Sequence, residues 1–119
     1  MLMQKLAIQP IPLETKPDGL DAGDNYLVVK VGPYFFSYTK KGSSIMFHMF
    51  SPEKNTIKDF DLGVESLIDY LFECYAWCEM LIVTIARPSL VKLAKKHGFR
   101  SFLTNKDGVA LMRVREWAV

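Results

Sequence analysis

The 119-residue sequence predicts a single domain, residues 1–119, with a mixed α/β fold. Three observations lead to this fold class. Aromatic and β-branched runs separated by Gly and Pro fill the first half, which is typical of an antiparallel meander. A helical apolar repeat follows, and then a continuously apolar run precedes a second, shorter helix and a C-terminal hairpin. Half of the residues are apolar, enough for a hydrophobic core in a domain of this size.

Strands are expected throughout the first half. Residues 2–8 form a first candidate strand that ends before Pro10, and residues 13–25 form a loop rich in proline, glycine and acids. Three β-rich runs follow, at residues 26–31, 34–39 and 44–50. The turn Lys40-Lys41-Gly42-Ser43 joins the last two runs, so the three together predict the meander.

A long helix is expected over residues 61–79, because apolar residues recur there at the i, i+3, i+4 spacing. On its other face Glu65, Asp69 and Glu73 form an acidic stripe, which we interpret as a solvated surface. The apolar run 80–86 then predicts a strand buried on both faces.

The end of the chain predicts a short helix and a hairpin. The helix opens at Arg87-Pro88-Ser89 and ends at Gly98, which suits a left-handed cap packed by Phe99. Residues 100–104 and 109–115 then form the arms of a hairpin, since Asp-Gly is a strong turn signal.

Charge is distributed unevenly along the chain. The formal net charge is +2, but residues 80–119 hold eight Lys/Arg against two acids, and residues 1–79 hold seven against eleven. A basic C-terminal part favours a polyanionic ligand such as a nucleotide, with a solvated helix face as the alternative. A nucleic-acid partner is not expected, since no known nucleic-acid motif is present.

Several function classes are disfavoured. No apolar run is long enough to span a membrane and residues 1–10 lack a signal-peptide core, so we expect a cytoplasmic protein. Cys74 and Cys78 lie four apart on one predicted helix, and we interpret both as buried, reduced thiols. A metal site is not expected. A zinc site built on the two cysteines would need two more ligands, and the two histidines of the chain, His48 and His97, lie far from them in sequence.

The segment Leu81–Phe99 resembles the strand and helix of the GCN5-related N-acetyltransferases, the GNAT superfamily. The family pattern Leu-Tyr-x-Lys-x-Gly-Phe corresponds here to Leu93, Ala94, Lys96, Gly98 and Phe99. The order of elements extends the resemblance over about three quarters of the chain. It implies a GNAT-like fold and acetyl-CoA as cofactor, with no other cofactor expected.

The chain also departs from the family pattern. The family's glycine-rich pyrophosphate loop is similar in position to residues 51–60, which contain no glycine. In the family a tyrosine protonates the departing thiolate, and Ala94 stands at the corresponding position here. An asparagine usually follows the buried strand in the family, and Arg87 stands at that position here. The two helices that wall the family's acceptor site are replaced by residues 13–25. Such short, altered forms resemble small GNAT-like proteins encoded by bacteriophages, some of which act on host machinery.

The resemblance gives a set of candidate site residues. His48, on the strand before the loop, is the candidate general base, with packing beside Met46 and Phe50 as the alternative. His97 is expected to cap the second helix. The candidate contacts for the phosphates of acetyl-CoA are Ser51, Lys54, Lys58, Arg87 and Lys92.

Two functions therefore stay open. The first is a GNAT-like domain with a degenerate acyl-CoA site that acts by binding another protein. If the domain is encoded by a phage, this partner would be a protein of the host cell. The many aromatic and methionine side chains of residues 34–50 favour it, and they also suggest a homodimer paired at a sheet edge. The second is an acetyl-CoA-dependent N-acetyltransferase with a divergent pyrophosphate loop. The sequence favours the first, because the glycine-rich loop and the tyrosine are both missing.

Overall fold

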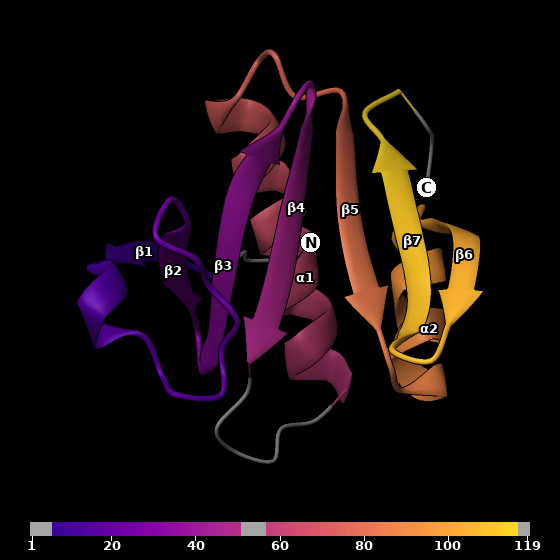
Figure 1. Ribbon diagram of the computed structural model, residues 1–119, viewed down its shortest axis with the longest axis horizontal. Coiled ribbons are helices and arrows are strands. Elements are labelled where there is room, and N and C mark those ends of the chain that lie inside the picture. The colour runs from indigo at the N-terminus through magenta and orange to yellow at the C-terminus, as the bar shows by residue number, and fades with distance from the viewer. Residues whose placement is uncertain (1–5, 51–56, 117–119) are drawn as a thin grey trace, which may run out of the picture.

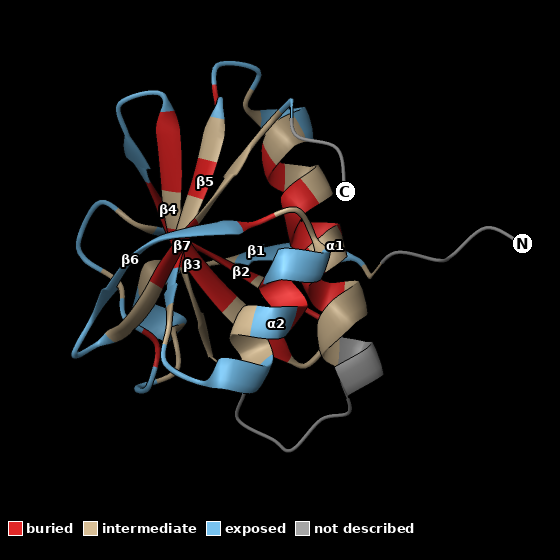
Figure 2. Cartoon of the chain, turned by 90° about the vertical axis from the view of Figure 1, so that its right-hand side faces the viewer, coloured by how far each residue is buried: buried red, intermediate tan, exposed pale blue. Residues whose placement is uncertain are grey.

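The computed structural model describes residues 6–50 and 57–116, with side chains from residue 60 onward in the second range. Within these ranges a seven-stranded sheet has the order β1-β2-β3-β4-β5-β7-β6. Helices α1 and α2 both lie on one face of this sheet (Figures 1 and 2). The mixed α/β prediction is confirmed, and so is the order of meander, helix, strand, helix and hairpin.

The elements have the following bounds: β1 Ile8–Ile11, η1 Leu13–Thr15, β2 Leu27–Val31, β3 Tyr34–Lys41, β4 Ser44–Phe50, α1 Ile57–Cys74, β5 Met80–Ile85, α2 Pro88–Lys96, β6 Arg100–Asn105 and β7 Gly108–Val114. Strands β1 to β4 pair antiparallel in succession, β4 pairs parallel with β5, and β7 lies antiparallel between β5 and β6. None of the described helices is both long and apolar enough to cross a membrane.

The first strand was predicted to end before Pro10, and this is wrong. Strand β1 runs through Pro10, which pairs with Val29 of β2. Because β1 is at the edge of the sheet, the missing N–H of a proline need not leave a neighbouring strand without a partner. Leu6 and Ala7 precede β1 and are not in a strand, and residues 2–5 of the predicted strand fall outside the described part of the chain.

Helix α1 also differs from its prediction, since it begins at Ile57 and ends at Cys74. After Cys74 the backbone turns, and the carbonyls of Tyr75 and Cys78 accept hydrogen bonds of 2.8 Å from the Arg115 guanidinium. The amide of Glu79 donates to Ser43 at 2.8 Å. These long-range bonds replace the helical ones that the apolar spacing predicted for residues 75–79.

Strand β5 was predicted to be buried on both faces, and only one face is. Leu81 and Val83, on the side of the helices, are buried. Met80 and Ile82 on the other side are half-buried, and Thr84 is exposed. The reason is that both helices pack on the same face, so the other face of β5 has no helix over it (Figure 2).

The end of α2 and the hairpin agree with their predictions. Gly98 has a φ of 90°, its amide donates to Lys95 at 3.1 Å, and the Phe99 amide donates to Ala94 at 3.2 Å. This is a left-handed cap that places buried Phe99 beneath the helix. In the hairpin turn, the Asn105 side chain accepts a hydrogen bond of 2.8 Å from the Asp107 amide.

Candidate functional site

Strands β4 and β5 pair only at their beginnings. The parallel ladder joins Ser44–Met46 to Met80–Ile82 and stops there. Beyond it the strands diverge toward their C-terminal ends, as Figure 1 shows. Residues 47–50 of β4 still pair with β3, and residues 83–85 of β5 still pair with β7. The facing edges therefore carry backbone N–H and C=O groups that no β4–β5 ladder uses.

A cavity of about 410 Å³ lies where the two strands diverge, within the size range of small-molecule sites. Helices α1 and α2 complete its walls. Its lining residues come from β3, β4, α1, β5, α2 and the segments after β5 and α2: Phe36, Phe47, Met49, Phe50, Phe60, Val64, Val83, Thr84, Ile85, Ala86, Arg87, Leu90, Ala94 and Phe99. Most of these side chains are apolar, so the cavity suits an apolar or amide-bearing chain more than a compact polar ligand.

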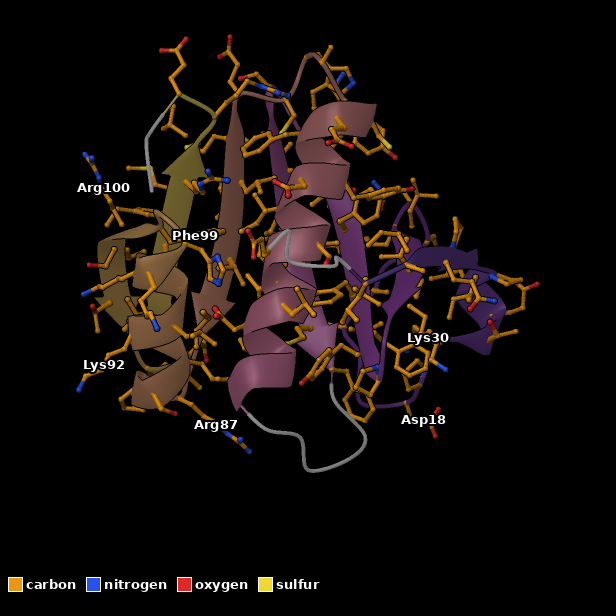
Figure 3. The ribbon with its side chains drawn as sticks, turned by 180° about the vertical axis from the view of Figure 1, so that it is seen from behind. Asp18, Lys30, Arg87, Lys92, Phe99 and Arg100 are labelled. Carbon is orange, nitrogen blue, oxygen red and sulfur yellow. The ribbon has the colours of Figure 1, made fainter. Side chains whose placement is uncertain are left out.

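Arg87 contributes the one charged side chain among the described residues that line this cavity. It is the residue that precedes α2, with a φ of −84° and a ψ of 124°, and it is exposed. Lys92 is exposed further along α2 and does not line the cavity. Figure 3 shows Arg87 projecting from the beginning of α2, and Lys92 pointing away from the sheet. Of these two cations, Arg87 is therefore the one that can contact an anionic part of a ligand in the cavity.

The other predicted phosphate contacts cannot be placed in this way. Ser51 and Lys54 lie outside the described residues. Lys58 lies in the first turn of α1, where the backbone but not the side chain is described. Their predicted role stays a prediction.

His48 lies on the opposite face of β4 from the buried wall of the cavity. In register it pairs with Ser37, and its ring stacks on Tyr26, with centroids 5.9 Å apart and planes inclined by 20°. His48 is half-buried and is not a lining residue, although its neighbours Phe47 and Met49 are. A base at this position would have to act through the gap between the diverging strands, from the side opposite the helices.

Ala94 lies in the buried wall and is 6% exposed. It offers no hydroxyl to the cavity, and neither cysteine replaces one, since neither Cys74 nor Cys78 lines it. Burial raises the pKa of the Cys78 thiol, whose sulfur lies 3.4 Å from the Met80 carbonyl oxygen. Cys74 is exposed, so its predicted burial is wrong, because α1 ends there and turns outward. Among the described residues no three metal-binding side chains gather.

A smaller polar cavity of about 110 Å³ lies between α1, β7 and the end of α2, lined by Glu65, Ile68, Asp69, His97 and Arg113. The solvated-surface interpretation holds for Glu73, which is exposed, and is wrong for Glu65 and Asp69, which are half-buried there. Burial lowers the pKa of Arg113, and Asp69 opposes that shift.

His97 joins the two helices at this second cavity. Its Nε2 is hydrogen-bonded to the Asp61 carboxylate of α1. His97 is also the residue after the last turn of α2, where its amide donates to Ala94 at 2.9 Å. The expected capping position is confirmed, and the link to α1 is an addition that the sequence did not indicate.

Comparison of whole chains complements these observations. No protein-family model matches the sequence. A search of curated proteins finds no match either. Comparison with solved structures does find similar chains.

The structure of IAA acetyltransferase from Bacillus cereus is 17% identical, with a TM-score of 0.65, over 92% of this chain and 99% of that one. The N-acetyltransferase PseH of Campylobacter jejuni is 14% identical, with a TM-score of 0.60, over 76% of this chain and 67% of that one. A complex of PseH with acetyl coenzyme A gives the same values.

The predicted resemblance is confirmed at the level of the fold. Similar solved structures include these acetyltransferases and one of the GNAT family from Staphylococcus aureus. The mixed seven-stranded sheet with α1 and α2 on one face matches their architecture. The chain therefore has the fold of the GCN5-related N-acetyltransferases.

Proposed function

We propose that this protein binds a coenzyme A thioester in the cavity between β4 and β5. The observation that carries the proposal is the cavity itself, about 410 Å³ with mainly apolar walls, at the point where the β4–β5 ladder ends. A solved structure with this fold holds acetyl coenzyme A, which supports the same class of ligand here.

Each part of such a ligand has a matching surface. The arm of coenzyme A contains amides, which can pair with the unused backbone groups of Phe47–Phe50 and Val83–Ile85 as an added strand would. The thioester end then meets apolar side chains. The phosphates carry negative charge, and Arg87 lies where the cavity is exposed.

The lining favours binding over group transfer. In the part of the lining that the structure describes, the polar side chains are those of Thr84 and Arg87, and neither is a suitable general base at neutral pH. Among the described residues, no tyrosine or cysteine lines the cavity to protonate a departing thiolate. Binding of the thioester without efficient transfer agrees with this set of groups.

The second candidate function is transfer of the acyl group to an amine. The observation that favours it is the position of His48, on the part of β4 that diverges from β5, between two residues that line the cavity. In such a reaction the amine would attack the thioester carbonyl, and His48 would take the proton from the amine. The C–S bond would then break, and coenzyme A would leave as a thiolate that takes its proton from water. A backbone N–H of the open strand edge would stabilise the charge on the carbonyl oxygen.

Isothermal titration calorimetry with coenzyme A and acetyl-CoA tests the proposal. We expect saturable binding with one ligand per chain, and a matching rise in melting temperature with ligand concentration. A Val83→Trp variant should abolish the heat of binding, because the indole would fill part of the cavity. Leu27→Trp is the matched control, since Leu27 is 55% exposed on β2 and does not line the cavity.

No binding at millimolar ligand would overturn the proposal. Transfer is measured separately, as release of free thiol when acetyl-CoA is mixed with amines. Saturable binding with no thiol release above the uncatalysed rate would support the binding function and exclude the second candidate for the amines tried.

A further inference from the structure

The described side chains of the inner cavity wall are all apolar. Its most buried lining side chains, all 7% exposed or less, are Phe36, Phe47, Val64, Val83, Ala94 and Phe99. The polar lining side chains, Thr84 and Arg87, are both exposed. The cavity therefore changes from polar at its exposed side to hydrocarbon in its interior.

The interior is held open by rigid neighbours. The rings of Phe36 and Phe47 meet edge to face with centroids 6.3 Å apart, and those of Phe47 and Phe99 do so at 6.2 Å. Such edge-to-face contacts favour one arrangement of the rings. These three aromatic side chains form a continuous wall across the sheet and the end of α2.

Ala94 is the smallest side chain of the buried wall, and its position is fixed by the helix cap. Its carbonyl accepts hydrogen bonds from His97 at 2.9 Å and from Phe99 at 3.2 Å. Helix α2 is further joined to α1 through His97 and Asp61. The helix is therefore held in place, and the space beside the Ala94 methyl group is not closed by a shift of α2.

We propose that the buried interior accepts the hydrocarbon chain of a longer acyl group, such as butanoyl or hexanoyl, in preference to acetyl. This inference rests on the proposed binding of coenzyme A thioesters. An acetyl group ends in one methyl and would leave most of the buried apolar wall without a partner. Each further methylene placed against that wall is removed from water, which is worth about 0.8 kcal/mol or about fourfold in affinity.

The division of the cavity between the two parts of the ligand follows from their polarity. The amide-bearing arm needs hydrogen-bond partners, and the open edges of β4 and β5 supply them at residues 47–50 and 83–85. The acyl chain needs none. It therefore takes the interior beside Val64, Val83 and Ala94.

The test is calorimetry with coenzyme A and with its acetyl, butanoyl and hexanoyl thioesters, all below micelle-forming concentrations. We expect affinity to rise along the series, by about two hundredfold from acetyl to hexanoyl when all four added methylenes are buried. In Ala94→Phe the ratio of hexanoyl to acetyl affinity should fall toward one, because the ring occupies the interior. Ala94→Leu is the milder second variant, in case the phenyl ring prevents folding, and should lower the same ratio.

Ala76→Leu is the control, since Ala76 is exposed beyond the end of α1 and should keep the wild-type ratio. A flat or falling series in the wild-type protein would overturn this inference while the proposed function stands. A rising series that both Ala94 variants leave unchanged would also overturn it, since the chain would then bind elsewhere. If neither coenzyme A nor any thioester binds, the proposed function fails first.

Discussion

The ring of Tyr26 stacks on the imidazole of His48, with centroids 5.9 Å apart and planes inclined by 20°. This contact covers one side of the candidate base with a residue from the segment that precedes β2. Because the stacked ring contributes to stability, one substitution of His48 can distinguish a packing role from a catalytic role.

Replacing His48 with alanine should leave the affinity for acetyl-CoA within about twofold of wild type, because His48 does not line the cavity. Loss of the stacked ring should cost about 0.5–1.5 kcal/mol of unfolding free energy. Calorimetry and urea denaturation measure the two effects. If the protein releases thiol in the presence of an amine, the same variant should slow that release by about a hundredfold or more.

Tyr26→Ala is the matched control for this change, since it removes the stacking but keeps the imidazole. It should reduce stability by a similar amount and retain any transfer activity. Full activity in His48→Ala would remove His48 from the candidate site, and a large loss of affinity would show that it contacts the ligand.

Arg87→Ala should weaken binding of acetyl-CoA by about threefold to tenfold, as expected for an exposed cation facing phosphates. The loss should shrink in high salt, because the interaction is screened. Acetyl-pantetheine, which has no phosphates, should bind equally well to both proteins. Lys92→Ala serves as comparison, and we expect a smaller loss because Lys92 does not line the cavity. Equal losses of affinity in Arg87→Ala and Lys92→Ala would contradict a direct contact between Arg87 and the phosphates.

Tyr38 should make the protein less stable in alkaline solution. Its hydroxyl is hydrogen-bonded to that of Tyr75 at 2.8 Å. Burial, and then this contact, raises the pKa of Tyr38 above its ordinary value of 10.0. Above that pH the unfolded chain loses the Tyr38 proton while the folded chain keeps it. Stability therefore falls as the pH rises beyond 10, with a limiting slope of about 1.4 kcal/mol per pH unit from this group.

Urea denaturation between pH 9 and pH 11 measures this effect. The variant Tyr38→Phe should lose less stability over the interval than wild type, since the other titrating groups are the same in both proteins. Parallel pH profiles for the two proteins would show that Tyr38 ionises normally in the folded state.

The hypothesis of a protein partner and of a homodimer can be tested at strand β6. This strand is at the edge of the sheet and exposed along its length (Figure 2), and its Phe102 and Leu103 are 50% and 54% exposed. An exposed antiparallel edge can pair with a second copy of itself across a two-fold axis. Light scattering should then give a dimer mass that Phe102→Lys converts to a monomer. A monomer at all concentrations would argue against the homodimer.

Much of the fold could be predicted because its signals are local. The cap at Gly98, the hairpin after it and the strands of the meander all follow from residue types at short spacing. The end of α1 could not be predicted in this way. It depends on Arg115, which binds the carbonyls of Tyr75 and Cys78 from about forty residues away in sequence.

The candidate site could be predicted only in part. Arg87 was a candidate phosphate contact implied by the family resemblance, and it does line the cavity. Val64 and Phe99 were not predicted to line a cavity, because the apolar residues of a cavity wall have the same sequence pattern as those of a packed core. The cavity exists because β4 and β5 diverge after their short ladder, and no local sequence pattern predicts this divergence.

The most direct test of acyl-CoA binding is an amide ¹H–¹⁵N NMR titration of the protein with acetyl-CoA. Binding in the cavity should give saturable shifts at Phe47–Phe50, at Val83–Ile85 and along α2, with the amides of β6 unchanged. An unchanged spectrum at saturating acetyl-CoA, or shifts confined to surfaces away from the diverging strands, would contradict it.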